Sequence, residues 1–181
     1  MVIIEETILQ GVYIISNFYA TDDRGLFVKM YNKKLFEAHN IDFEIKESFF
    51  SVSKKNVIRG MHFQLPPYDH SKLVYVSSGG IIDVVVDLRK NSKTFKQYIS
   101  VELSAENKKS ILISSGFAHG FKSLEDNTIT IYNVDSEYNP MADAGIFYKS
   151  FGFNWELEAP IISQRDAEFD GLLSFCKINP F

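Results

Sequence analysis

The stretch Val57-Ile58-Arg59-Gly60-Met61-His62-Phe63-Gln64 is the strongest strand signal in this chain, and Lys72 follows ten residues after its histidine. Apolar and β-branched residues dominate the stretch, and the prolines at 66 and 67 that follow it cannot continue a sheet ladder. Side chains of a strand alternate between its faces, so the pattern predicts Arg59 on one face and His62 on the other. Cationic side chains beside a histidine indicate a site for anion binding or proton transfer.

The composition indicates one globular domain rich in β-structure. The chain has 181 residues, of which 45% are hydrophobic and 23% charged, as is usual for a domain with a sizeable core. Aromatic residues make up 14% of the chain, and their large planar side chains suit the surfaces of β-sheets. We therefore expect residues 1–181 to form a single domain.

Charge and cysteine content restrict the partners and the compartment. A net charge of −4 gives the whole chain no attraction to nucleic acid or to an anionic membrane. Cys176 is the only cysteine and cannot form an internal disulfide, which is typical of a reducing compartment. The first residues are acidic where a signal peptide is basic, and no apolar run approaches the ~20 residues that span a bilayer. We expect a cytoplasmic protein that binds neither nucleic acid nor membrane.

Short apolar runs separated by turns recur along the whole sequence. They predict strands at residues 12–15, 26–31, 43–53, 57–63, 72–77, 81–88, 98–103, 110–113, 116–121 and 128–134. Between two of these runs, Ser78-Gly79-Gly80 is a typical hairpin sequence. Helices are expected only at 32–39 and, as a single turn, at 163–169. The pattern predicts an antiparallel sandwich or barrel, because a parallel sheet would need a helix between successive strands.

The four histidines differ in their surroundings. His39 ends the predicted helix and His70 lies in a loop with two prolines, so both are expected to be exposed to solvent. His62 and His119 each lie inside an apolar strand, where a histidine is most often a hydrogen-bonded core residue. The basic residues near His62 favour a functional role for it, as a base that works near neutral pH.

The other candidate residues each admit two interpretations. A basic side chain is either a phosphate ligand or a charge in a solvated turn or salt bridge, a tyrosine is either core or catalytic, and an aspartate either caps a turn or orients another group. His62-Phe63-Gln64 supplies one imidazole and one weak ligand, and nearby cations oppose a divalent ion, so no metal is expected. The residues alone predict a β-barrel with a histidine and a basic pocket. These candidates are Arg24, Arg59, Lys72, Arg89, Tyr132 and Asp166.

Seven stretches resemble the dTDP-4-dehydrorhamnose 3,5-epimerase family in their order and spacing, and they extend over almost the whole chain. The resemblance implies a cupin-type jelly roll, all-β with short peripheral helices, that uses neither a metal nor another cofactor. It also implies a homodimer in which strands from residues 1–50 contribute to the interface and cross to the partner. The stretches are residues 23–25 (DRG), 56–64 (NVIRGMHFQ), 72–74 (KLV), 83–90 (DVVVDLRK), 103–108 (LSAENK), 116–121 (GFAHGF) and 162–167 (ISQRDA).

The resemblance further implies a substrate and a reaction in deoxysugar and surface polysaccharide biosynthesis. The substrate is a nucleotide-diphosphate 4-keto-6-deoxy sugar of the dTDP-4-dehydro-6-deoxyglucose type, whose C3 and C5 protons are acidic because both carbons neighbour the C4 carbonyl. Removing one proton gives an enolate, and reprotonation on the opposite face inverts the centre. By resemblance His62 is the base and Asp166 orients it, while Lys72 stabilises the enolate oxygen. Tyr132 matches the acid on the other face of the sugar.

Substrate-binding roles are implied for a second group of residues. Arg59 and Arg24 match ligands of the diphosphate, with Arg24 reaching in from the partner subunit. Other residues expected at the substrate are His119, Asp83, Tyr138, Glu47 and Phe49.

This sequence departs from the family pattern in the residues that place the substrate. The family usually reads Gln-Asp-Asn-His-Ser before the active-site strand, whereas this chain has Glu47-Ser48-Phe49-Phe50-Ser51. Lys29 replaces a usual glutamate, and Ala20 replaces a usual aromatic residue, with Phe18 and Tyr19 slightly earlier. A carboxylate at position 47 is unfavourable near a phosphate unless a cation offsets it. We therefore expect an epimerase of C3, C5 or both that takes an altered substrate.

Other functions remain open on the sequence. They are a single-centre epimerase or a ketoisomerase acting on a GDP- or CDP-linked sugar, a non-catalytic cupin that binds sugar nucleotides, and a metal-dependent cupin oxygenase. The joint presence of His62, Tyr132 and Asp166 favours an enzyme over a binding protein.

Overall fold

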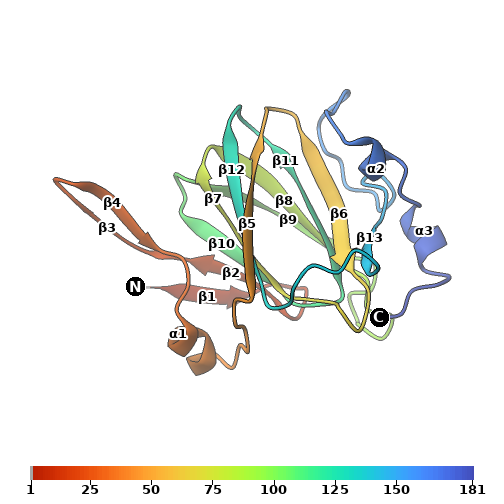
Figure 1. Cartoon of the computed structure of the whole chain (residues 1–181), viewed down its shortest axis with the longest axis horizontal. Coiled ribbons are helices and arrows are strands. Elements are labelled where there is room, and N and C mark those ends of the chain that lie inside the picture. Colours follow the sequence, from red (N-terminus) through yellow and green to blue (C-terminus); the bar gives the residue numbers. More distant parts are fainter. Residues whose placement is uncertain (1) are drawn as a thin grey trace.

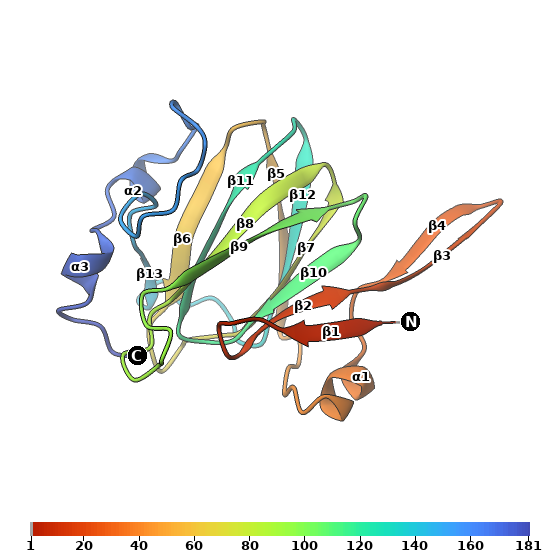
Figure 2. The same cartoon turned by 180° about the vertical axis from the view of Figure 1, so that it is seen from behind.

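Two antiparallel sheets face each other in the computed structural model, which describes residues 2–181 (Figures 1 and 2). The larger sheet has six strands, in the order β1 (Ile3–Glu6), β2 (Val12–Ser16), β10 (Lys109–Ile113), β7 (Lys72–Ser78), β12 (Thr128–Val134) and β5 (Glu47–Ser53). The smaller sheet has five, in the order β13 (Asp143–Gly145), β6 (Ile58–Gln64), β11 (Phe117–Ser123), β8 (Gly80–Asp87) and β9 (Tyr98–Ser104). The prediction of an all-β antiparallel sandwich is confirmed.

The helices are short and peripheral. Both predicted helices are present, as α1 (Lys33–Ala38) and α2 (Gln164–Ala167), and a further turn, α3 (Leu172–Phe175), follows near the C-terminus. Asn32 caps α1, because its Oδ1 accepts a hydrogen bond from N of Leu35 at 3.2 Å. Within residues 2–181, no helix is long and apolar enough to cross a membrane.

The hairpin predicted at Ser78-Gly79-Gly80 is wrong. β7 pairs with β10 and β12, whereas β8 pairs with β11 and β9, so this turn carries the chain from one sheet to the other. Gly79 has a φ of +74°, and a Cβ there would lie 2.3 Å from Oγ1 of Thr128, so no larger residue fits. The turn sequence was compatible with either arrangement, because the strands that β7 and β8 pair with lie far along the chain.

The apolar core has three layers: one between the sheets, one on the outer face of the smaller sheet, and one where α1 packs on the outer face of the larger sheet. Alternate residues of β8 divide between the first two layers, with Ile81 and Val85 in the first and Val84 and Val86 in the second. The C-terminal segment with α2 and α3 covers the second layer (Figure 1), and Trp155 is buried there. Each fully buried side chain of this kind stabilises the fold by about 1.5–3 kcal/mol, so this packing fixes the C-terminal segment beside β6.

The hairpin of β3 (Phe18–Asp22) and β4 (Gly25–Lys29) projects away from the sandwich (Figures 1 and 2). Its two strands pair only with each other among the described residues. At the edge of the larger sheet, β5 has β12 as its only paired strand in that same part of the chain. Both surfaces expose apolar groups that one chain does not cover. On the hairpin these are Phe18, Tyr19, Leu26 and Phe27, between 39% and 56% exposed, and on β5 they are Phe49, Phe50 and Val52.

Candidate active site

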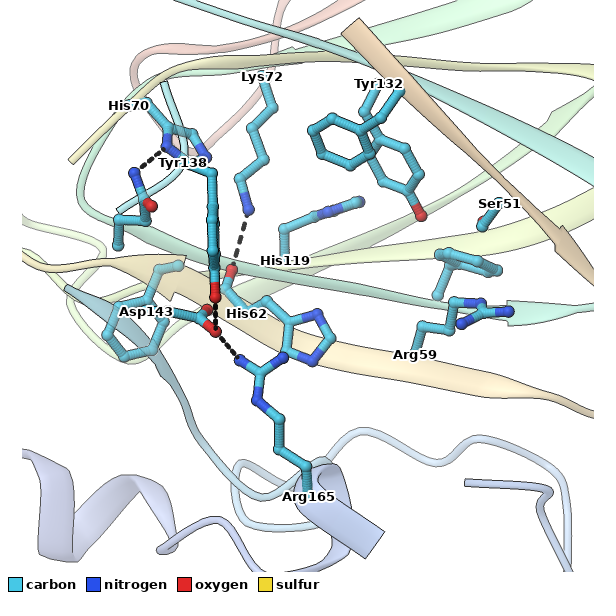
Figure 3. A pocket seen from close by; sticks show the side chains of 14 residues that line it. Ser51, Arg59, His62, His70, Lys72, His119, Tyr132, Tyr138, Asp143 and Arg165 are labelled. Atoms are coloured by element: carbon cyan, nitrogen blue, oxygen red, sulfur yellow. Dashed lines mark hydrogen bonds and ion pairs between the residues drawn. The ribbon is translucent and has the colours of Figure 1, made fainter. Parts of the chain in front are cut away.

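A pocket of about 320 Å³ opens between the two sheets, beside β5 and β6 (Figure 3). Strands of both sheets line it, together with the segments that flank β13 and the turn of α2. Its lining combines imidazole, ammonium, guanidinium and phenol groups with aromatic rings. The lining residues are Phe49, Ser51, Arg59, His62, Phe63, Gln64, His70, Lys72, His119, Phe121, Tyr132, Tyr138, Asp143 and Arg165.

A β-bulge in β6 brings Arg59 and His62 to the same side of the sheet. His62 pairs with His119 on β11, but between this pair and the pair of Arg59 the register shifts, so two residues of β6 oppose one of β11. Gly60 permits the bulge, since its φ is +130° and a Cβ would lie 2.5 Å from Cα of Gly120. The predicted placement of Arg59 and His62 on opposite faces is wrong, because the extra residue interrupts the alternation and both side chains line the pocket.

Asp166 fixes the imidazole of His62. Its Oδ1 lies 2.8 Å from Nε2 of His62, and its Oδ2 accepts a hydrogen bond from N of Gly60 at 2.9 Å. Ser163 positions the aspartate, because its Oγ caps α2 and accepts a hydrogen bond from N of Asp166. Burial works to raise the pKa of Asp166, but the hydrogen bond and charge of His62 and the N–H of Gly60 hold that pKa below its ordinary value. The carboxylate stays ionised and accepts from Nε2, which leaves Nδ1 of His62 as the basic atom.

Lys72 begins β7 and extends into the pocket towards His62 (Figure 3). Its Nζ donates a hydrogen bond to the backbone oxygen of His62 at 3.2 Å. Burial lowers the pKa of Lys72 to about 8, against the opposing effects of the carboxylates of Asp143 and Asp83. The amine is therefore still mainly a cation at neutral pH, and it is held at a fixed distance from the His62 backbone.

Tyr132 approaches the pocket from the larger sheet. It pairs with Phe49 across β12 and β5, and the two rings are stacked with centroids 4.9 Å apart and planes 17° apart. Burial raises the pKa of the Tyr132 phenol, so its hydroxyl keeps its proton well above neutral pH. Since His62 comes from the smaller sheet, a base and a proton donor face the cavity from opposing sheets.

His119 and Asp83 form a second imidazole–carboxylate pair at the floor of the pocket. Nε2 of His119 lies 2.7 Å from Oδ2 of Asp83, and the two side chains are 4% and 0% exposed. His119 lines the pocket directly, opposite His62 in the strand register, and Asp83 lies behind it. Among residues 2–181, Oδ1 of Asp83 has no hydrogen-bond partner, and a buried acceptor left unpaired costs about 1–3 kcal/mol.

Two charged groups form the entrance. Arg59 donates from Nε to Oγ of Ser53 at 3.1 Å and from one terminal nitrogen to the backbone oxygen of Val52 at 3.3 Å. Its remaining N–H groups are available to an anion, since a guanidinium has five. On the other side, Asp143 accepts a hydrogen bond from the hydroxyl of Tyr138 at 3.2 Å and pairs with Arg165 at 2.7 Å (Figure 3).

Three of the residues expected at the substrate do not line the pocket of this chain. Asp83 lies behind His119. Glu47 does not line the pocket; its Oε2 accepts a hydrogen bond from N of Tyr138 at 2.8 Å and holds the loop that carries this tyrosine. Arg24 lies at the tip of the β3–β4 hairpin, where it pairs with Asp22 of the same turn. The sequence departure at Glu47 therefore affects a loop contact within the chain, and the pocket of one chain lacks Arg24.

Sequence reasoning missed seven residues that line the pocket: Ser51, Phe63, Gln64, His70, Phe121, Asp143 and Arg165. The expectation that His70 is exposed is wrong, because Gln64 donates a hydrogen bond to its Nδ1 at 2.9 Å and draws the loop inwards. Asp143 lies outside every predicted strand, and no pattern in the sequence distinguishes it. Arg165 directly precedes Asp166, and this adjacency is the one signal that points to it.

The side chains of the described residues suit acid–base chemistry and anion binding rather than the binding of a metal ion. In this part of the chain, no group of three or more His, Cys, Asp and Glu side chains is placed to hold a metal ion. Of the three imidazoles that line the pocket, those of His62 and His119 each use one ring nitrogen for a carboxylate. The second nitrogen of His62, the ammonium of Lys72 and the phenol of Tyr132 are the reactive groups that converge on the cavity.

Comparisons with known proteins agree with this site. The sequence profile of dTDP-4-dehydrorhamnose 3,5-epimerase matches residues 6–173. The chain is 41% identical to the dTDP-4-dehydrorhamnose 3,5-epimerase of Shigella flexneri over 148 residues, which is 80% of this chain and 82% of the relative. Two crystal structures share its cupin-type fold. The dTDP-4-dehydrorhamnose 3,5-epimerase of Bacillus anthracis, with TDP and PPi bound, has a TM-score of 0.91 and 37% identity over 94% of this chain and 99% of that one.

The second structure is the dTDP-6-deoxy-D-glucose-3,5-epimerase of Legionella pneumophila in complex with dTDP-4-keto-L-rhamnose. It has a TM-score of 0.91 and 33% identity, covering 96% of this chain and 94% of that one. The profile match extends over both sheets and reaches the turn that carries Asp166. The chain belongs to the dTDP-4-dehydrorhamnose 3,5-epimerase family, and it is an enzyme of the isomerase class.

Proposed function

We propose that this chain inverts C3, C5 or both in a nucleotide-diphosphate 4-keto-6-deoxy sugar of the dTDP-4-dehydro-6-deoxyglucose type. The observation that carries the proposal is the placement of His62 and Tyr132 on opposing sheets with a cavity between them. Inversion needs a base on one face of the sugar and an acid on the other, and these two side chains supply that pair. The bound dTDP-4-keto-L-rhamnose of the Legionella pneumophila structure supports the substrate class.

The reaction begins with proton removal beside the carbonyl. Nδ1 of His62 takes the proton from C3 or C5, and the electron pair moves onto the C4 oxygen. Asp166 stabilises the imidazolium that forms, because its carboxylate lies 2.8 Å from Nε2. Nζ of Lys72 carries a positive charge at neutral pH and stabilises the enolate oxygen.

Inversion is completed from the other face. The hydroxyl of Tyr132 delivers a proton to the same carbon, and the raised pKa of this phenol ensures that the proton is present at neutral pH. His119, held by Asp83 behind it, contacts the sugar from the floor of the cavity, and Tyr138 contacts the substrate from the entrance. Arg59 binds the diphosphate with the N–H groups that its strand contacts leave unused.

We further propose that the chain forms a homodimer and that each complete site needs both chains. Arg24 of one chain reaches the diphosphate bound in the pocket of its partner. Two apolar surfaces support this, the projecting β3–β4 hairpin and the open edge of β5 beside the pocket. An unpaired edge strand that exposes apolar side chains is a pairing site for another chain. Strands from residues 1–50 then contribute to the dimer interface, and residues 1–181 form a single domain. A cytoplasmic location fits the one cysteine, Cys176, which is free.

Inversion at a single centre is the second candidate. The stack of Phe49 on Tyr132 favours it, because a phenol clamped against a neighbouring ring delivers its proton to a narrow region of the cavity. If only one carbon lies in that region, only that centre is inverted.

Proton exchange tests the proposal and separates the candidates. The protein is incubated in D2O with dTDP-4-keto-6-deoxyglucose, and the C3 and C5 protons are followed by NMR. We expect exchange in the wild type and none in His62→Ala. Exchange at both carbons, with dTDP-rhamnose formed when the reductase is added, identifies a double epimerase, and exchange with product inverted at one carbon identifies the single-centre enzyme. An isomerised keto product would show a ketoisomerase instead, and absence of exchange from the folded dimer would contradict the proposal.

A further inference from the structure

The loop that returns the chain from β6 to β7 is held to the pocket by a buried amide. Gln64 is 3% exposed, and its Nε2 donates to the backbone oxygen of Tyr68 at 2.7 Å. Its Oε1 accepts a hydrogen bond from N of Asn139 at 2.6 Å. These two backbone partners determine which end of the amide is which, because a backbone N–H can only donate and a backbone oxygen can only accept. The atom of Gln64 that faces Nδ1 of His70, at 2.9 Å, is therefore the donor.

This contact determines the tautomer of His70. A ring nitrogen that accepts a hydrogen bond carries no proton, so the neutral imidazole of His70 carries its proton on Nε2. Burial, and then the charge of Lys72, lower the pKa of His70 to about 3, so the ring stays neutral at any working pH. His70 lines the pocket, and within residues 2–181 no acceptor lies within hydrogen-bonding distance of its Nε2. The pocket thus contains an N–H donor that the chain leaves unused.

The position of this donor indicates its partner. Figure 3 shows His70 and Lys72 together at one end of the pocket, with Arg59 at the other end and His62 between them. If Arg59 binds the diphosphate, the sugar ring lies over His62 and its far side reaches the end that holds Lys72 and His70. The C4 carbonyl, which Lys72 contacts in the proposed reaction, is then within the reach of both side chains.

We propose that Nε2–H of His70 is a second hydrogen-bond donor, beside Nζ of Lys72, to the C4 oxygen of the keto sugar as it becomes an enolate. This inference rests on the proposed function, since it uses the same oxygen. A neutral donor suits this position, because a second cation beside Lys72 would be repelled by it, whereas an N–H dipole stabilises the oxyanion without that repulsion. Gln64 is the positioning residue, since it fixes both the tautomer and the direction of the ring.

Two matched variants separate the donor from the loop contact. In His70→Asn the amide oxygen retains the position of Nδ1 and still accepts from Gln64, but no group replaces Nε2–H. In His70→Gln the amide nitrogen reaches the position of Nε2 and restores a donor to the cavity. We expect the rate of C3 and C5 proton exchange in D2O to fall by about 10²-fold in His70→Asn, the usual loss for one oxyanion donor, and by less than about tenfold in His70→Gln. Affinity for dTDP alone is expected to be unchanged in both, because the nucleoside diphosphate lies at the other end.

A measurement on the unchanged protein supports the variants. Proton–nitrogen NMR of His70 is expected to show a proton on Nε2, no titration between pH 5 and 9, and a downfield shift of that proton when the keto sugar nucleotide binds. If the wild type exchanges these protons and His70→Asn exchanges them at the same rate, the role of His70 is overturned and the proposed function is not. A proton found on Nδ1, or a ring that titrates in this range, would overturn that role as well, even if His70→Asn did not fold. Absence of exchange in the wild type would overturn the proposed function and this inference together.

Discussion

Nε2 of His62 lies 2.8 Å from Oδ1 of Asp166, although the two residues are 104 positions apart in the chain. The strand β6 carries the histidine, and the short turn α2 carries the aspartate to its outer side. The same carboxylate accepts the N–H of Gly60 in the bulge, so it links the imidazole to the backbone that positions it. Because this contact engages Nε2, Nδ1 is the ring nitrogen of His62 that stays free for the cavity.

Asp166→Asn is expected to lower kcat by about 10³–10⁴-fold while the protein stays folded. An amide in this position donates to Nε2 of His62 as readily as it accepts, so the imidazole can place its proton on Nδ1 and lose its basic atom. Steady-state epimerisation with circular dichroism measures both effects. A loss of less than tenfold would show that the carboxylate does not determine the tautomer.

The pH dependence of kcat is expected to follow Lys72. Its pKa is lowered to about 8 and its cation is the active form, so activity is present below this pH and falls as pH rises through about 8. Lys72→Met is expected to lose about 10²–10³-fold in kcat and to lose this alkaline limb with it. The Met variant is also expected to be at least as stable at pH 7, because it buries no ammonium. An alkaline limb that persists in Lys72→Met would assign it to another group.

Arg24 offers a test of the shared site. Arg24→Ala and His62→Ala are each expected to be nearly inactive, since one lacks the diphosphate contact and the other the base. When the two are unfolded together and refolded as a mixture, half of the dimers are mixed and one site in each is intact, so about a quarter of the wild-type activity is expected to return. Light scattering checks that the species is a dimer. If no activity returns from well-folded mixed dimers, Arg24 acts within its own chain.

The bulge can be tested with two glycines. Gly60→Ala places a Cβ 2.5 Å from Cα of Gly120 at a φ of +130°, so we expect a loss of more than about 2 kcal/mol of unfolding free energy and a loss of activity. Gly152→Ala is the matched control, because Gly152 also has positive φ, at +86°, but nothing lies within 4 Å of its Cβ position. It is expected to cost about 1–2 kcal/mol from the backbone alone and to leave kcat unchanged. Equal costs in the two variants, from urea unfolding, would show that the close approach of β6 and β11 is not decisive.

The fold class and the family of this protein could be predicted from local patterns in its sequence. All ten predicted strands overlap strands of the structure. Apolar runs with period two and turn residues are local signals of strands, and the alternate apolar side chains are the ones that become buried between the two sheets. Motifs such as residues 56–64 and 162–167 indicated which family to expect. The resemblance to that family also singled out His62, Lys72, Tyr132 and Asp166, which the structure places around or behind one pocket.

How those residues face one another depends on contacts between strands and loops that are far apart in the sequence. Arg59 and His62 lie on the same side of the sheet because a bulge forms where Gly60 of β6 meets Gly120 of β11. The alternation of residues along β6 alone does not predict this contact with another strand. His70 lines the pocket because Gln64 bonds to its ring, to the nearby backbone of Tyr68 and to the distant backbone of Glu137 and Asn139. Glu47 faces a loop instead of the cavity for a similar reason, its bond to Tyr138. Such outcomes depend on partners far along the chain, and local sequence patterns carry no information about them.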